Sequence, residues 1–272
     1  LLLFSNRPDH HIPYNVGYMA KQSGRGYAAH GQGGWGTKLH DHWSWDTDDL
    51  EEGPGGFPQE NRKPFYSGQN AKKELTTGEY DVVVFTESAG NAHGADTTDT
   101  VNALVNFIEL ARQYNPDTQA ILYSCWNALN NQVDIGEVAA WRDKTLKELE
   151  WWEQVTDQVN TRISGQKMLL VPASVVLAEV ALDAVSGNIP GMNSARSMFI
   201  DDIHSTSTGY YVAALPIYAA MFKTSPLGIT TRKVNGDVNG VRFNYSLPSE
   251  ASAQHIQQIA WDVIKDYSRA GF

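Results

Sequence analysis

A carboxylate and a histidine three residues apart are the part of this sequence best suited to chemistry. They stand in Asp201-Asp202-Ile203-His204, shortly before an apolar run from Val212 to Phe222. On a turn that opens a helix, a carboxylate at this spacing can hold an imidazole in one tautomer and one orientation for base catalysis. The simpler alternative is that Asp201 or Asp202 caps the helix and that His204 is a surface residue.

Such a pair needs a scaffold, and four short apolar runs have the pattern of buried parallel strands. Each run is continuous rather than alternating, as expected where helices cover both faces of a sheet. The predicted strands are residues 1–4, 80–85, 120–125 and 167–172. Because sites form at the carboxyl ends of parallel strands, we expect the chemistry at that edge of the sheet.

Apolar residues at helical spacing predict helices between and after these strands. The predicted helices are residues 99–114, 145–164, 174–185, 212–222 and 249–269. This alternation predicts an α/β fold, a flavodoxin-like three-layer α/β/α sandwich with a mostly parallel central sheet. We expect residues 1–272 to form a single domain, with a long loop insertion near 46–70 and a small hairpin near 228–247.

Composition narrows the classes of function. The 272 residues carry a formal net charge of −10 and no clustered basic face, so we expect no nucleic acid partner. No segment approaches the ~20 apolar residues of a membrane-spanning helix, so we expect no membrane span. Cys125, the single cysteine, stands in an apolar run and is expected to be a buried thiol rather than a nucleophile. The apolar run at residues 1–4 is too short for a signal peptide. We expect a periplasmic or secreted protein, with the leader not present in this sequence.

Four blocks of sequence, in order along the chain, carry a resemblance to a known family. They are residues 1–7, 33–39, 80–88 and 201–211. These blocks resemble those of the SGNH or GDSL-type hydrolases, an α/β esterase superfamily. In that family a serine follows the first strand, a glycine the second and an oxyanion-binding asparagine the third, and an Asp-x-x-His pair lies near the C-terminus. The resemblance implies ester hydrolysis by a serine nucleophile without a cofactor.

The first block departs from the family pattern at the nucleophile. The family has glycine, a polar residue and then the serine, whereas this chain has Ser5-Asn6-Arg7, which puts Arg7 in the serine register. If Ser5 is the nucleophile, His204 takes its proton, Asp201 orients the ring, and an acyl-enzyme forms and is hydrolysed. If Arg7 replaces the serine, the chain is a catalytically inactive carbohydrate-binding protein on the same fold.

The third block departs from the family at the oxyanion site. Thr86-Glu87-Ser88 stands where many members have Gly-x-Asn-Asp. An ionised Glu87 donates no hydrogen bond, so Asn91 is the candidate oxyanion donor, with the amide of Gly36 as a second one. An ordinary turn role is the alternative for Asn91. Glu87 itself either holds a neighbouring loop in place or binds a sugar hydroxyl.

Tryptophans in and after the glycine-rich second block indicate the substrate. Trp35 and Trp43 have polar neighbours, and a flat aromatic face packs well against the apolar face of a sugar ring. We therefore expect an oligosaccharide or other small-molecule ester as substrate, with removal of an acetyl group as the reaction. Residues expected to contact it are Arg7, Trp35, Trp43 and Glu87. Burial in the core is the alternative for the tryptophans.

Histidines in the first third of the chain keep a third function open. His40-Asp41-His42 could supply two metal ligands, with His10, His11 and His30 elsewhere in this region, so a metal-dependent hydrolase is an alternative. No His-Glu-x-x-His or Cys-x-x-Cys motif accompanies them. Solvated loop histidines are the simpler explanation, and we expect no metal ion.

Overall fold

The computed structural model describes residues 12–33, 37–44, 71–90, 92–94, 96–130, 133–229, 235–238, 241–244 and 249–272. The strand predicted at residues 1–4 and the loop predicted at 46–70 lie outside these ranges. The chain divides into two compact units. Unit 1 comprises residues 29–125 and 150–170, and unit 2 comprises residues 2–28, 126–149 and 171–272. The single domain stays a prediction.

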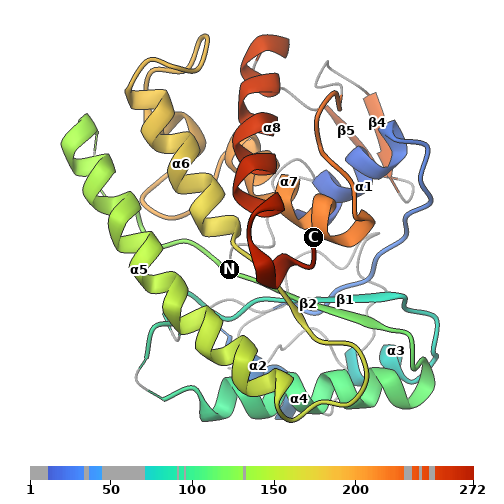
Figure 1. Ribbon diagram of the computed structural model, residues 1–272. Coiled ribbons are helices and arrows are strands. Elements are labelled where there is room, and N and C mark those ends of the chain that lie inside the picture. Colours follow the sequence, from blue (N-terminus) through green and yellow to red (C-terminus); the bar gives the residue numbers. More distant parts are fainter. Residues whose placement is uncertain are drawn as a thin grey trace. The chain divides into compact units, whose positions relative to one another are not determined.

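A three-stranded sheet is formed by three of the four predicted strands. Its order is β1-β2-β3, with β1 at Val82–Phe85, β2 at Gln119–Tyr123 and β3 at Leu169–Val171. β1 and β2 lie side by side and run parallel, so that Val83 is opposite Ala120 and Phe85 is opposite Leu122 (Figure 1). The prediction of an α/β fold of the three-layer α/β/α class with a parallel sheet is confirmed.

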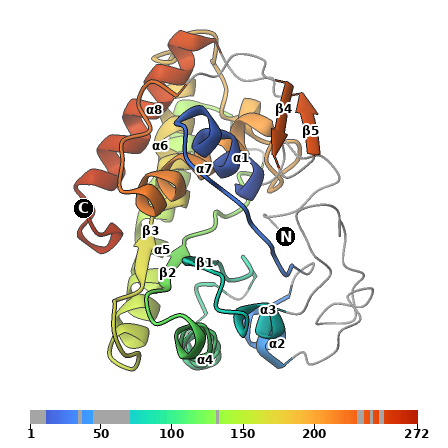
Figure 2. The same cartoon turned by 90° about the vertical axis from the view of Figure 1, so that its right-hand side faces the viewer.

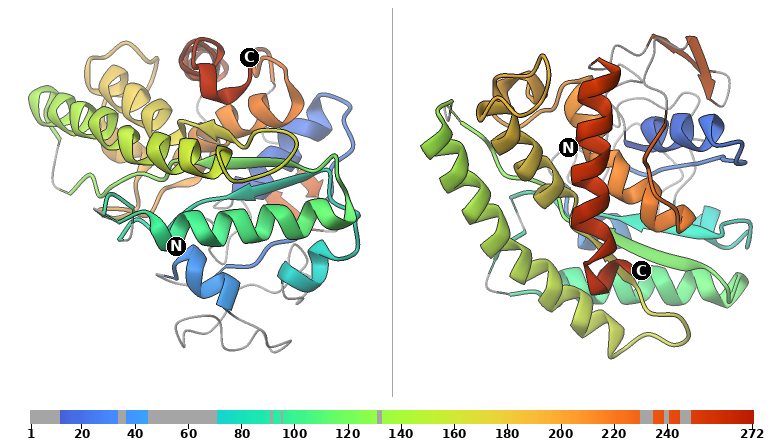
Figure 3. Two further views of the ribbon diagram at one scale, coloured as in Figure 1. Left: turned by 60° about the horizontal axis from the view of Figure 1, so that its bottom comes forward. Right: turned by 45° about the horizontal axis from the view of Figure 1, so that its top comes forward.

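Unit 1 is built around helix α4 (Thr98–Tyr114), which packs against the short helices α2 (Leu39–Ser44) and α3 (Ala71–Leu75). α4 runs along β1 and β2 (Figure 3, left). Its apolar positions face inward, and the ring of Phe107 lies 5.9 Å from that of Phe85 in β1. The helix predicted at residues 99–114 is therefore present, because its apolar residues recur at helical spacing and find a sheet to cover.

Unit 2 is built around helix α7 (Ser207–Phe222). Its neighbours are α1 (Ile12–Gln22), α6 (Ala173–Val185), α8 (Glu250–Lys265) and the 3₁₀ helix η3 (Ala195–Met198). Figure 2 shows α1, α6 and α8 grouped around it. Every residue of α7 from Gly209 to Ala220 is buried, as expected of a helix that is apolar on all sides. A second 3₁₀ helix, η4 (Ser268–Ala270), follows α8.

Several helix ends differ from the predicted ones for identifiable reasons. α5 spans Ile135–Asn160 and begins well before the predicted Thr145. The amide of Glu137 donates to Oδ1 of Asp134 at 2.8 Å, and Glu137 Oε2 accepts the amide of Val133 at 2.9 Å, so a reciprocal cap starts the helix early. α7 begins at Ser207 because the side chain of Thr206 accepts the amide of Gly209.

An antiparallel pair of strands lies within the range where the sequence predicts a hairpin. β4 (Asn235–Val238) pairs with β5 (Val241–Asn244), with Asn235 opposite Asn244. Within the described ranges, no helix combines the length and the apolar character needed to cross a membrane.

Candidate active site

The turn between η3 and α7 holds Asp201 and His204 against each other. Nδ1 of His204 lies 2.7 Å from Oδ2 of Asp201. Oδ1 of the same carboxylate accepts the backbone amide of Ile203 at 2.9 Å and that of His204 at 2.7 Å. One carboxylate oxygen therefore shapes the turn while the other orients the ring. The structure thus brings together the two residues that the three-residue spacing singles out.

The hydrogen bonds to Asp201 favour its charged form. Partial desolvation acts to raise the pKa of this carboxyl, but the amides of His204 and Ile203 and the ring of His204 outweigh it and lower the pKa to about 2. An ionised Asp201 accepts a proton-bearing Nδ1, which leaves Nε2 as the ring nitrogen that can take up a proton. The side chains of His204 and Asp201 are 35% and 54% exposed, so a solute can reach the ring.

The backbone of this turn is held at four consecutive points. Each carbonyl from Asp201 to His204 accepts a hydrogen bond from another residue of unit 2. The carbonyl of Asp201 accepts from Nη1 of Arg196 at 2.9 Å, and that of Asp202 accepts from the amide of Leu129 at 2.7 Å. The carbonyl of Ile203 accepts from Nε1 of Trp126 at 2.9 Å, and that of His204 accepts from the amide of Ile200 at 2.8 Å. A turn whose carbonyls are all engaged presents its side chains in one geometry, which is what a positioned base requires.

Gly209 allows α7 to start close behind the turn. A Cβ atom at this position would lie 2.4 Å from the carbonyl oxygen of Met198 and 2.8 Å from Cβ of Ser205. Ser205 directly follows His204, and it pairs with Phe199 in an isolated antiparallel bridge. The glycine of the Gly209-Tyr210-Tyr211 sequence is therefore required by space, and it sets the distance between the helix and the turn.

Glu87 follows β1 and is 1% exposed. Its carboxylate accepts the amide of Leu39 at 3.2 Å, the amide of Ser88 at 2.7 Å and the hydroxyl of Thr100 at 2.8 Å. These contacts tie the first turns of α2 and α4 to the end of β1. They support the loop-holding role, one of the two roles predicted for Glu87, because its carboxylate is buried among donors of the chain itself.

Cys125 lies two residues after β2 and is buried. Its Sγ lies 3.4 Å from the carbonyl oxygen of Glu87. Desolvation raises the pKa of this thiol to about 12, so it carries no thiolate at neutral pH. The prediction of a buried thiol is confirmed.

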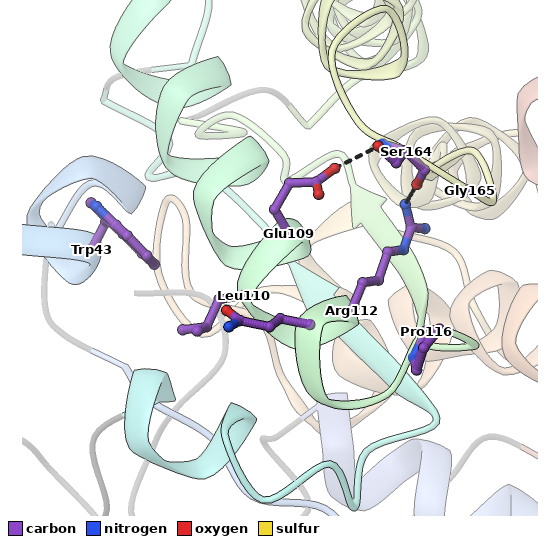
Figure 4. Close-up of a pocket in the computed structure, with 8 residues that line it drawn as sticks. Trp43, Glu109, Leu110, Arg112, Pro116, Ser164 and Gly165 are labelled. Atoms are coloured by element: carbon purple, nitrogen blue, oxygen red, sulfur yellow. Dashed lines mark hydrogen bonds between the residues drawn. The ribbon is translucent and has the colours of Figure 1, made fainter.

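Trp43 lies on α2 and is half-buried. Its ring packs edge-on against Phe107 at 4.9 Å, and Nζ of Lys72 lies 5.3 Å from the ring centroid. The ring also borders a cavity of about 600 Å³ in unit 1 (Figure 4), where its neighbours are Glu109, Leu110, Arg112, Gln113, Pro116, Ser164 and Gly165. A sugar-stacking role for Trp43 stays a prediction.

The two charged side chains in this cavity have structural partners. Oε1 of Glu109 accepts the amide of Ser164 at 2.7 Å, and Nη1 of Arg112 donates to the carbonyl of Ser164 at 2.5 Å (Figure 4). Nη2 of Arg112 donates to the carbonyl of Gln166 at 2.6 Å. Glu109 and Arg112 therefore hold the segment between α5 and β3 onto α4.

Two described histidines of the first third, His30 and His42, occupy separate hydrogen-bonding positions. Nδ1 of His42 lies 3.0 Å from Nε2 of Gln32, and burial lowers the pKa of His42 to about 4. Asp41 accepts the amide of Lys38 at 3.1 Å, and Nδ1 of His30 lies 2.5 Å from the hydroxyl of Tyr80. In the part of the chain that the structure describes, no three His, Cys, Asp or Glu side chains converge as a metal site requires. His10 and His11 lie outside that part.

Five of the predicted site residues also lie outside the described ranges, namely Ser5, Arg7, Trp35, Gly36 and Asn91. Their roles stay predictions. The structure adds three site residues that the sequence did not indicate, which are Trp126, Leu129 and Arg196. A local signal existed for the first two, because both follow the carboxyl end of β2 within a few residues. Arg196 carried no such signal.

No protein-family model matches the sequence, and no curated protein matches it. Among solved structures, the chain is similar to the crystal structure of a DUF4886 family protein from Bacteroides uniformis ATCC 8492, determined at 1.50 Å resolution. The two are 13% identical over 92% of this chain and 88% of that chain, with a TM-score of 0.56. At this identity the similarity shows the fold alone, and it agrees with the three-layer α/β/α class.

Proposed function

We propose that this protein is an ester hydrolase in which His204 is the general base and Asp201 orients it. The observation that carries the proposal is the 2.7 Å contact between Nδ1 of His204 and Oδ2 of Asp201. An ionised carboxylate at this position fixes the ring tautomer and stabilises the imidazolium that forms when Nε2 takes up a proton. The exposure of the ring and the four fixed carbonyls of the turn support the same role.

In the proposed reaction the hydroxyl of Ser5 attacks the acyl carbonyl and transfers its proton to Nε2 of His204. The tetrahedral intermediate collapses to an acyl-enzyme as the imidazolium returns that proton to the departing alcohol. A water molecule then attacks the acyl-enzyme with His204 again as base, which releases the acid and restores Ser5. Asn91 and the amide of Gly36 are the proposed donors to the oxyanion.

The proposed substrate is an acetylated oligosaccharide or another small ester. Support comes from the tryptophans at positions 35 and 43, whose ring faces suit the apolar faces of sugars. Arg7 is proposed to lie at the substrate, because it occupies the register in which the resembling family carries its nucleophile.

The direct test is turnover together with covalent labelling of the whole chain. We expect hydrolysis of p-nitrophenyl acetate and acetate release from acetylated oligosaccharides. A fluorophosphonate probe should label the protein, and Ser5→Ala should abolish both the label and the turnover. Labelling that survives in Ser5→Ala would assign the nucleophile to another hydroxyl.

Arg7 in the nucleophile register favours a second candidate function, a carbohydrate-binding protein without turnover. In that case acetylated oligosaccharides bind, as measured by calorimetry, while the native chain releases no acetate and takes up no fluorophosphonate. The variant Arg7→Ser would then gain both labelling and hydrolysis. Failure of Arg7→Ser to gain either, with turnover present in the native chain, would remove this candidate.

A further inference from the structure

We infer that Arg196 is a positioning residue that couples the loop after β2 to the turn carrying the proposed base. The inference rests on the proposed function in one respect, that His204 is the base of the reaction. It concerns what keeps His204 aligned with Asp201 rather than what the reaction is.

The guanidinium of Arg196 joins two segments of unit 2 that are far apart in the sequence. Nη1 donates to the carbonyl of Asp201 at 2.9 Å, and Nη2 donates to Oδ1 of Asp202 at 2.9 Å. Nη2 also donates to the carbonyl of Asn130. The planar fork of arginine presents its donors in a fixed geometry, so it can hold these acceptors at once where a lysine offers a single charged point.

Arg196 is itself fixed by the chain around it. Its amide donates to Oγ of Ser194 at 3.1 Å, which caps η3, and the hydroxyl of Ser197 donates to the carbonyl of Ser194 at 2.6 Å. The side chain is 28% exposed. The backbone of Arg196 is therefore fixed by the cap of η3 while its guanidinium is fixed by its acceptors, so the residue can transmit the position of one segment to the other.

The backbone of the loop after β2 is shaped to meet Arg196. Asn130 adopts a positive φ of 52°, a left-handed conformation that asparagine tolerates better than most residues. The carbonyl of Asn130 accepts from Arg196, and the amide of the preceding residue, Leu129, donates to the carbonyl of Asp202 at 2.7 Å. The loop after β2 and the turn are thus joined by the amide of Leu129 and by the partly exposed guanidinium of Arg196.

Loss of Arg196 should loosen the ring of His204 without dissolving the turn. Nη1 of Arg196 donates to the carbonyl of Asp201, whose carboxylate orients the imidazole of His204. Removing this donor therefore frees the peptide between Asp201 and Asp202. The donors Leu129, Trp126 and Ile200 remain. Because misplacement of a catalytic group by about 1 Å can cost about 100-fold in rate, we expect a roughly 10- to 100-fold loss in kcat with little change in KM.

The test compares Arg196→Gln with Arg142→Gln as a matched control. Arg142 lies in the same unit, is 31% exposed, and its Nη2 lies 2.7 Å from Oε1 of Glu179. The readout is the tautomer of the His204 ring in ¹⁵N-detected long-range NMR spectra, assigned by the signals that His204→Ala removes. This readout requires no substrate.

We expect the native chain and Arg142→Gln to show His204 protonated at Nδ1, and Arg196→Gln to show a mixture of the two neutral tautomers. Arg196→Lys, which keeps the charge and one donor, should lie between them and serves if Arg196→Gln does not fold. Ring signals in both Arg196 variants identical to those of Arg142→Gln would overturn the inference. Absence of ester hydrolysis in the native chain would instead count against the proposed function, while the ring spectra would still decide the role of Arg196.

Discussion

Oδ2 of Asp201 lies 2.7 Å from Nδ1 of His204, while Oδ1 of the same carboxylate holds the backbone of the turn. A second aspartate-histidine pair in unit 2 has the same length, with Nε2 of His255 2.7 Å from Oδ2 of Asp183. That pair joins α6 to α8, and Asp183 accepts there from the side chain of Asn188 rather than from turn amides. The two pairs differ in their setting, which makes His255 a control for His204.

His204→Ala should lower kcat/KM for ester hydrolysis about 1,000-fold or more, because the proposed base is lost. His255→Ala removes an equally short contact to a carboxylate and should leave kcat/KM within about twofold. Initial rates with p-nitrophenyl acetate and an acetylated oligosaccharide check both variants. Equal rates for His204→Ala and the native chain would contradict the proposed mechanism.

Asp201→Asn should flatten the dependence of stability on pH in acid. The folded pKa of Asp201, about 2, lies below the ordinary value of 3.8, so the unfolded chain takes up this proton first as the pH falls. The contribution of Asp201 to stability is therefore present above about pH 4 and is lost as the pH falls through about 2. Without this carboxylate, the free energy of unfolding should decline less steeply over that interval.

Urea unfolding at a series of pH values measures this effect. Asp117→Asn is the control, since it removes an exposed carboxylate from the turn before β2 and changes the net charge equally. A slope in Asp201→Asn as steep as that of Asp117→Asn would show that the turn amides do not hold the carboxylate in solution.

Gly209→Ala should destabilise the protein by about 1–3 kcal/mol, because the new Cβ would lie 2.4 Å from the backbone carbonyl oxygen of Met198, which must shift to accept it. The displaced helix start should also shift Ser205 and, with it, His204. Gly136→Ala is the matched control. A Cβ at position 136 would lie 3.4 Å from its nearest neighbour, Oδ1 of Asp134, so it meets no clash. Alanine in a helix should therefore raise the free energy of unfolding by about 0.5–1 kcal/mol. Thermal unfolding of both variants is the measurement, and equal changes in the two would contradict the packing argument.

Glu87→Gln should cost roughly 2 kcal/mol of unfolding free energy. The NH₂ group of the glutamine would face the buried groups that now donate hydrogen bonds to the carboxylate, so at least one of them would lose its acceptor. Thr100→Val removes one of those donors and should cost about 1 kcal/mol. A double-mutant cycle between the two positions isolates their shared hydrogen bond, which is 2.8 Å long. A coupling energy near zero would contradict the structural role of Glu87.

The sequence predicted the parts of the molecule whose signals are local. Continuous apolar runs indicated β1, β2 and β3, and a spacing of three residues indicated the Asp201 and His204 pair. The early start of α5 had a local signal as well, in the reciprocal pair Asp134 and Glu137, but the apolar periodicity alone pointed to a later start.

The contacts that hold the turn had no such signal. Arg196 bonds to the carbonyl of Asn130, and any residue has a carbonyl, so no pattern of residue types marks the acceptor. Trp126 had a local signal in its position just after β2, but its acceptor, the carbonyl of Ile203, had none, because the fold rather than a sequence spacing brings the two together. Residues that act through backbone acceptors far along the chain become visible only in the fold.

α7 has no solvent face over the stretch from Gly209 to Ala220, and the proposed base stands just ahead of its first turn. A helix enclosed on all sides opens only when the structure around it opens, so its amides should exchange with solvent only by global unfolding of unit 2. Heat or denaturant should then abolish the proposed hydrolysis and the tertiary structure of unit 2 in a single transition. The working lifetime of the site is therefore set by the unfolding rate of the unit that encloses α7.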